Sequence, residues 1–113
     1  MRMKGGFEGI MNFLSMKEEI INVLKTVYDP EIPVNIYDLG LVYQVVMDDA
    51  NNVTIDMTFT APNCPAADFM LEDVRQKVEN LEKVKSVQIN IVFEPEWSPD
   101  RMTEEAKLEL GLL

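Results

Sequence analysis

The sequence predicts a two-layer α/β (α+β) domain with helices packed on one face of a small mixed three-stranded sheet. The spacing of apolar residues along the chain is typical, in turn, of a helix, two strands, a helix, a strand and a helix. A polar stretch separates the first two strand-like runs, and a helical run separates the second from the third. The length of 113 residues suits one domain. We expect residues 15–113 to form that domain and residues 1–14 to be a flexible leader.

The first predicted helix spans residues 16–27, where apolar residues recur at the intervals of an amphipathic helix. Asp29-Pro30 should end it, because proline disfavours helical geometry in the residue before it. Residues 29–40 have neither period but are too apolar for a solvated tether, so we predict an ordered loop. The apolar stripe of the helix consists of Ile20, Ile21, Leu24, Val27 and Tyr28.

A β-hairpin is predicted over residues 41–60. Apolar and other residues alternate over 41–48, and a second alternation follows the polar stretch DDANN over 53–60. The second run has Thr54, Asp56, Thr58 and Thr60 on the face opposite its apolar residues, so we expect one side of the sheet to be hydrated. The apolar face of this run consists of Val53, Ile55, Met57 and Phe59.

A second helix and a third strand complete the predicted sheet. The period becomes helical from Pro65 to Leu81, and proline is favourable at a first helical position because its missing N–H needs no partner there. Alternation over residues 87–93 predicts the third strand. Because a helix joins strands two and three, we favour a parallel right-handed crossover with strand one between them. A short terminal helix should end at Gly111.

The composition excludes several classes of function. Ten Lys and Arg against twenty Asp and Glu give a net charge of −10, which disfavours nucleic acid and anionic membranes as partners. No apolar run has the length of a membrane span. The chain has no His, the commonest general base and metal ligand. One cysteine cannot form an internal disulfide, and we expect a cytoplasmic location.

Cys64, the single cysteine, lies where the strand pattern gives way to the helical one. A position at or next to the N-cap of the second helix would stabilise its thiolate through unpaired N–H groups and the helix dipole. The alternative is a structural cysteine that packs as a small apolar residue into the strand–helix junction. The residues themselves leave both interpretations open.

The chemistry available to Cys64 is narrow. A cysteine hydrolase would need a base, normally His, and a redox dithiol would need a second cysteine; both are missing. A soft metal or a partner's sulfur remains. An iron–sulfur cluster usually takes four cysteines, so any cluster would have to be shared with another molecule.

Three acidic residues in the 29–40 loop and one tryptophan are further candidates. Asp29 precedes a proline and Asp38 lies two residues before a glycine, and both positions favour a turn role. Glu31 has no such explanation. Trp97 follows the third strand and is expected to cover the core.

Three segments in the same order carry a family resemblance: DPEIPVNIYDLGLVY, TFTAPNCP and EPEWSPDRMTEEAKLELG. Together they resemble the SufT and PaaD-type metal–sulfur (iron–sulfur) cluster assembly family, closest to the SufT-like stand-alone bacterial and archaeal branch. The resemblance covers residues 16–113 and implies a small α/β domain that assists the maturation of iron–sulfur proteins. The chain lacks the extra C-terminal cysteines of PaaD-type proteins, which argues against that branch's metal site.

The resemblance also implies roles for individual residues. Cys64 would be the functional thiol and a possible shared ligand of iron or of a cluster, with Thr60 as a neighbouring hydroxyl. Asp29, Glu31 and Asp38 would lie near the cysteine, and we expect at least one of these carboxylates within a water-bridged contact of it. Asn63, the residue before the cysteine, is counted with this supporting group.

Three functions remain in competition. The first is an iron–sulfur assembly or carrier factor that is not an enzyme and binds no cofactor stably, only a transient cluster or iron. Its partners would be scaffold and recipient proteins, and it would form a homodimer at least transiently. The second is a non-catalytic accessory subunit that docks onto a larger complex, with Cys64 structural. The third, a cysteine-dependent transferase with a carboxylate base, is disfavoured by the absence of His.

Overall fold

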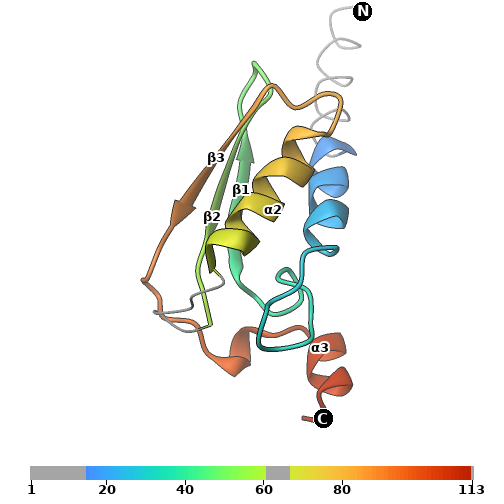
Figure 1. Cartoon of the computed structure of the whole chain (residues 1–113), viewed down its shortest axis with the longest axis vertical. Helices are drawn as coiled ribbons and strands as arrows, with labels where there is room; N and C mark the ends of the chain where they lie inside the picture. The colour runs from blue at the N-terminus through green and yellow to red at the C-terminus, as the bar shows by residue number, and fades with distance from the viewer. Residues whose placement is uncertain (1–14, 61–66, 113) are drawn as a thin grey trace, which may run out of the picture.

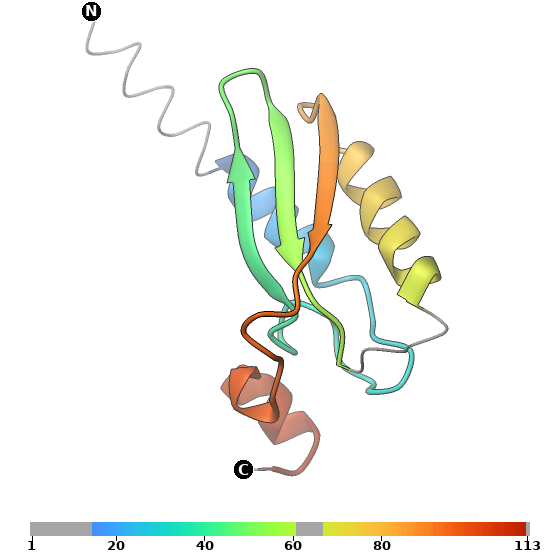
Figure 2. The ribbon, with the colours of Figure 1, turned by 90° about the vertical axis from the view of Figure 1, so that its left-hand side faces the viewer.

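The computed structural model describes residues 15–60 and 67–112, which form two layers (Figure 1). The first helix, helical over residues 15–24, and α2 cover one face of the sheet, while α3 lies beyond the sheet's end (Figure 2). The predicted fold class and element order are confirmed. The labelled elements are β1 (Val42–Met47), β2 (Asn52–Met57), α2 (Ala67–Glu79), β3 (Ser86–Ile91), η1 (Pro99–Arg101) and α3 (Glu104–Glu109).

The sheet is mixed, with strand order β1-β2-β3. β1 pairs antiparallel with β2, and β2 pairs parallel with β3 through the α2 crossover. The predicted parallel orientation of the second and third strands is confirmed, but the prediction that the first strand lies between them is wrong, because β2 and β3 pair directly. β2 occupies the centre because its inward residues are the most buried of the sheet: Val53, Ile55 and Met57 are at most 1% exposed.

The first helix ends at residue 24, not at residue 27 as predicted. Thr26 N–H and Val27 N–H donate to the carbonyls of Val23 and Leu24, three residues earlier. These bonds have the tighter 3₁₀ spacing and end the α-helix. The Thr26 hydroxyl also donates to Val23 O at 2.6 Å. Tyr28 therefore leaves the predicted apolar stripe; it forms an isolated bridge with Asn35 and is 59% exposed.

The other element bounds also differ from the prediction at their ends: α2 ends at Glu79 rather than Leu81, and α3 ends at Glu109 rather than Gly111. β2 ends at Met57 rather than Thr60, with one further backbone bond, from Thr58 N–H to Leu41 O, just past the last paired residues. β3 ends at Ile91, so that Phe93 lies past the strand and is 58% exposed. The predicted helix start at Pro65 lies outside the described residues.

The core lies between the inner face of the sheet and the two helices. The 29–40 loop is ordered as predicted and sends Val34, Ile36 and Leu39 into this core. Trp97 packs against the core from the C-terminal segment, which confirms its predicted covering role. Among the described residues, no helix is long and apolar enough to cross a membrane.

The turn at residues 38–40 receives the C-terminal segment. Trp97 Nε1 donates to Leu39 O at 2.7 Å, and Thr103 N donates to Asp38 O at 2.8 Å. Gly40 has a φ of +82°, and a Cβ on it would meet the backbone carbonyl of Arg101. Glycine is therefore needed here both for its conformation and for the close approach of η1.

Asp48 organises the β1–β2 turn. Its Oδ1 accepts hydrogen bonds from the backbone N–H groups of Ala50 and Asn52, both at 2.9 Å, and its Oδ2 accepts from Asn52 Nδ2 at 3.0 Å. The bonds from the Asn52 backbone and then its side chain lower the pKa of the Asp48 carboxyl, because they favour the ionised form. Asn51 completes the turn with a φ of +66°.

Replacing Gly40 by Ala is expected to lower the free energy of unfolding by more than about 3 kcal/mol, because both strain and overlap with the Arg101 backbone result. Gly111→Ala is the matched control. Gly111 also has a positive φ, +76°, but a Cβ there would meet nothing within 4 Å, so only about 1–2 kcal/mol of conformational strain is expected. Urea unfolding of both variants measures the difference, and equal losses would show that the approach of η1 to Gly40 contributes no stability.

Replacing Asp48 by Asn is expected to lower stability at neutral pH and to become silent in acid. The pKa of Asp48 is lower in the folded chain than the ordinary value of 3.8, so its contribution is present above pH 3.8 and is lost as pH falls through the folded-state pKa. Thermal unfolding across this range is the measurement. Asp49→Asn is the control, because none of these three hydrogen bonds involves Asp49. An effect of Asp48→Asn on stability that does not change with pH would contradict the proposed link between the pKa of Asp48 and stability.

Candidate functional site

The predicted thiol lies in the connection from β2 to α2. Cys64 and Asn63 fall outside the described residues, so the expected contact between a carboxylate and Cys64 stays a prediction. The structure does describe both sides of the connection: Thr60 before it and α2 from Ala67 after it. The site is therefore defined by what lies around these two points.

Asp29 shapes the 29–40 loop. Its side chain is among the few buried polar ones, with the residue 7% exposed. Asp29 Oδ2 accepts hydrogen bonds from the backbone N–H groups of Glu31 and Ile32, both at 2.8 Å. This closes an Asx-type turn around Pro30 and confirms the turn role favoured by the sequence. Glu31 contributes its backbone N–H to the turn and is itself exposed.

Asp38 is also held by local hydrogen bonds. Its Oδ2 accepts from Asn35 Nδ2 at 2.9 Å, and its backbone N–H donates to Asn35 Oδ1 at 2.9 Å. Its carbonyl accepts from the Thr103 backbone. Within residues 15–60 and 67–112, no group of three His, Cys, Asp or Glu side chains is placed to hold a metal ion. The geometry thus gives Asp38 an architectural part.

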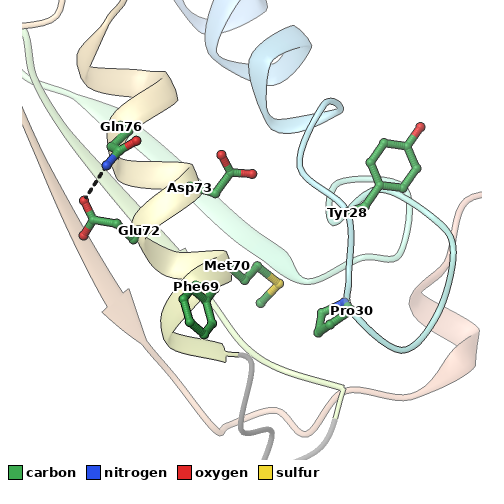
Figure 3. A pocket seen from close by; sticks show the side chains of 7 residues that line it. All are labelled: Tyr28, Pro30, Phe69, Met70, Glu72, Asp73 and Gln76. Atoms are coloured by element: carbon green, nitrogen blue, oxygen red, sulfur yellow. Dashed lines mark hydrogen bonds between the residues drawn. The ribbon is translucent and has the colours of Figure 1, made fainter.

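One cavity lies between the first turns of α2 and the start of the 29–40 loop (Figure 3). Its volume is about 430 Å³. In Figure 3, Phe69 and Pro30 face each other across its mouth, with Met70 between them. We call it the α2 cavity. Its lining consists of Tyr28, Pro30, Phe69, Met70, Glu72, Asp73 and Gln76.

A second cavity, of about 420 Å³, lies between the end of β2 and the segment after β3. Thr60, the hydroxyl singled out by the sequence motif, belongs to its lining. Glu94 and Glu96 add two carboxylates, and Phe93 and Trp97 add aromatic surface. We call it the Thr60 cavity. The two cavities therefore border the β2–α2 connection through residues on either side of it, Thr60 and Phe69.

Phe69 was not singled out from the sequence. It is 80% exposed, whereas its neighbour Met70 is buried. The sequence could have revealed it through its position on the helix. Met70, Val74 and Val78 form the buried apolar stripe of α2, and Phe69 is an apolar residue that lies outside this stripe. Such a residue gains nothing from the core, so it marks a surface rather than a packing position.

Both cavities have an acidic character. Carboxylates line each of them, and no Lys or Arg is among their described lining residues. An acidic, partly apolar surface suits a cation or a basic protein segment and disfavours phosphate or other anionic ligands.

Comparison with known proteins places these features in a family. Residues 17–91 match the model of a family described as iron–sulfur cluster assembly protein. The chain is 61% identical over 101 residues to an Fe-S protein maturation auxiliary factor of Porphyromonas gingivalis, covering 89% of this chain and 96% of the relative. It is 37% identical over 86 residues to the Fe-S protein maturation auxiliary factor SufT of Staphylococcus aureus, covering 76% and 98% of the two chains.

A solved structure supports the same assignment. The crystal structure of a domain of unknown function, DUF59, from Bacillus anthracis superposes with a TM-score of 0.81 at 38% identity and covers 88% of this chain and 94% of that one. The fold is thus shared over nearly the whole length of both chains. The match of the family model, the relatives and this structure agree with the resemblance inferred from the three motifs. The chain belongs to the family of iron–sulfur cluster assembly proteins.

Proposed function

We propose that the protein is a maturation factor for iron–sulfur proteins that assembles or carries iron or a cluster in transit and is not an enzyme. The observation that carries this proposal is the 61% identity to a relative named Fe-S protein maturation auxiliary factor, over 96% of that relative's length. A match over almost all of the relative argues for a shared task rather than a shared subdomain. Residues 15–113 act as the single domain for it, behind a leader of residues 1–14.

Cys64 supplies the chemistry in this proposal. Its thiolate sulfur binds iron, which is a soft-ligand interaction that no other side-chain type in this chain offers as well. One cysteine provides one ligand, so the remaining ligands come from a partner or a second copy, and the cluster is cargo rather than a resident cofactor. Thr60 and Asn63 precede the thiol in the sequence and support it.

The partners follow from this shared ligation. A scaffold protein delivers the cargo and a recipient protein accepts it, each completing the coordination of iron in turn. A transient homodimer is a further source of a second thiolate. The acidic charge and the single cysteine suit a cytoplasmic location without nucleic-acid or membrane partners.

One observation favours a second candidate, an accessory subunit whose task is docking. Phe69 is 80% exposed and Phe93 58%, and each lies beside an acidic cavity. Exposed aromatic residues with a polar surround are typical of interaction surfaces. In this candidate Cys64 is structural, and replacing it would leave function intact.

Replacing Cys64 by Ala is expected to abolish maturation of iron–sulfur enzymes while leaving the melting temperature within a few degrees of the wild type. In cells that lack the gene, iron–sulfur enzyme activities are measured after complementation with wild type or variant. Anaerobic reconstitution followed by absorption spectroscopy measures iron binding by the purified chains. Cys64→Ser, which keeps size and polarity but not the soft ligand, is the matched control and should fail as Cys64→Ala does.

Full maturation by Cys64→Ala would refute the role of the thiol and support the accessory subunit. Loss of maturation together with a large loss of stability would assign Cys64 to packing. Sedimentation of the reconstituted wild type tests the dimer separately: a strict monomer with and without iron leaves partner proteins as the source of the other ligands.

The 29–40 loop provides a second test. Asp29→Asn keeps a side-chain oxygen that can accept from Glu31 N and Ile32 N, so stability is expected to change by less than about 0.5 kcal/mol. Asp29→Ala removes that acceptor and should cost about 1–3 kcal/mol. Glu31→Gln, at an exposed position, should be silent in stability. Chemical unfolding measures all three.

The maturation assay then separates architecture from chemistry. If the carboxylates serve the thiol, Asp29→Asn or Glu31→Gln lowers maturation while unfolding is unchanged. If maturation falls only in Asp29→Ala, in parallel with stability, the loop is architecture and the role that the resemblance implied for these charges is wrong.

A further inference from the structure

The α2 cavity presents apolar surface that the fold does not use. Phe69 is 80% exposed and Tyr28 is 59% exposed, although large aromatic residues on a small domain are normally packed. Pro30 is exposed on the opposite side of the cavity. Figure 3 shows Phe69 and Pro30 on the two sides of one opening, from α2 and from the loop. Two separate elements thus contribute to one apolar surface.

The charges around this surface are negative. Glu72 and Asp73 line the cavity, and its described lining contains no basic residue. Asp73 pairs with Lys77 at 3.3 Å, and the same Lys77 also donates to Thr26 O at 3.3 Å, so this lysine is engaged within the fold. Glu72 is exposed, and from the residues that the structure describes it accepts only a 3.3 Å bond from Gln76. Glu72 is therefore the carboxylate of this lining that has no cationic partner among the described residues, whereas Asp73 already pairs with Lys77.

We propose that the α2 cavity is the docking site for a segment of the recipient protein in which a Lys or Arg stands next to an aromatic or aliphatic side chain. The apolar side chain inserts between Phe69 and Pro30, and the cation pairs with Glu72. This deepens the proposed function and rests on it, since Phe69 lies on the helix that directly follows the Cys64 connection. Docking there brings the recipient to the helix that follows Cys64 in the sequence.

Charge complementarity decides between this occupant and a second copy of the chain. The chain carries a net charge of −10, and a second copy would bring further carboxylates against Glu72 and Asp73. Like charges placed opposite each other disfavour association. A basic segment instead gains both the apolar contact and the ion pair. Self-association is left to other surfaces, such as β1 and β3, the edge strands of the described sheet.

Site-specific photo-crosslinking in cells tests the proposal with the full chain. A benzoylphenylalanine replaces Phe69, and the crosslinked peptide of the partner is sequenced by mass spectrometry. The same probe at Phe93, the other exposed aromatic beside a cavity, is the matched control. Both positions are exposed, so folding should be unaffected. We expect the probe at 69 to join segments that contain Lys or Arg beside an apolar residue, and the probe at 93 not to join them.

The charge is tested in the same background. Glu72→Lys is expected to lower the crosslink yield at position 69 roughly fivefold or more, because it replaces attraction by repulsion. Glu79→Lys, an exposed position at the far end of α2, should leave the yield unchanged. No crosslink at 69, crosslinks to another copy of this chain, or a yield that is indifferent to Glu72→Lys would each overturn the proposal.

Failure of the proposed function gives a different result. Cys64→Ala keeps Phe69 and Glu72. If docking does not depend on the thiol, the crosslink to the basic segment persists in that variant. Crosslinked partners that are not iron–sulfur proteins, together with full maturation by Cys64→Ala, would refute the maturation role and the recipient as occupant. Crosslinks to basic segments of iron–sulfur proteins from the probe at position 69, and none from the probe at position 93, would support both the maturation function and the docking site.

Discussion

The fold depends on the contact between the turn at residues 38–40 and the C-terminal segment. Three successive residues of the turn each engage that segment: Asp38 O binds Thr103 N, Leu39 O binds the Trp97 indole, and Gly40 lies against Arg101. Because Leu39 is fully buried, the same turn also anchors the loop in the core. One short stretch therefore joins the loop, the core and the chain end.

This contact explains why the candidate site has fixed borders. The 29–40 loop cannot move away without exposing Val34, Ile36 and Leu39, and the segment 93–97 is held nearby by Trp97 and by the Tyr43 hydroxyl, which donates to Pro95 O at 2.7 Å. Both cavities are built from these held segments on one side and from the ends of β2 and α2 on the other. The end of β2 and the start of α2 thus lie at the same end of the sheet, next to these held segments (Figure 1).

Local features of this frame could be predicted from the sequence, whereas features that depend on distant partners could not. Alternating apolar and polar residues identified β2, and apolar residues at helical intervals identified α2. Each pattern reflects which side of a single element is buried. Strand order depends on which strand gains from neighbours on both sides, and alternation along one strand does not contain that information. The first helix ended early because Thr26 and Val27 bond three residues back, a choice between turn geometries that periodicity cannot detect. The turn roles of Asp29 and Asp38 were predictable since their partners lie within three residues.

The family motifs combine two kinds of residue that the geometry separates. Asp29, Asp38 and Gly40 shape the loop and its contact with η1, so their presence in a motif follows from the fold whether or not they touch a ligand. Pro30, by contrast, is placed by the Asp29 turn on the wall of a cavity whose other wall is Phe69. The turn is held by the buried Asp29 carboxylate, which accepts from two backbone N–H groups. The side chain of Pro30 is therefore free to line the cavity. The acidic residues Asp29 and Asp38 of the loop therefore have an architectural part that their local hydrogen bonds account for.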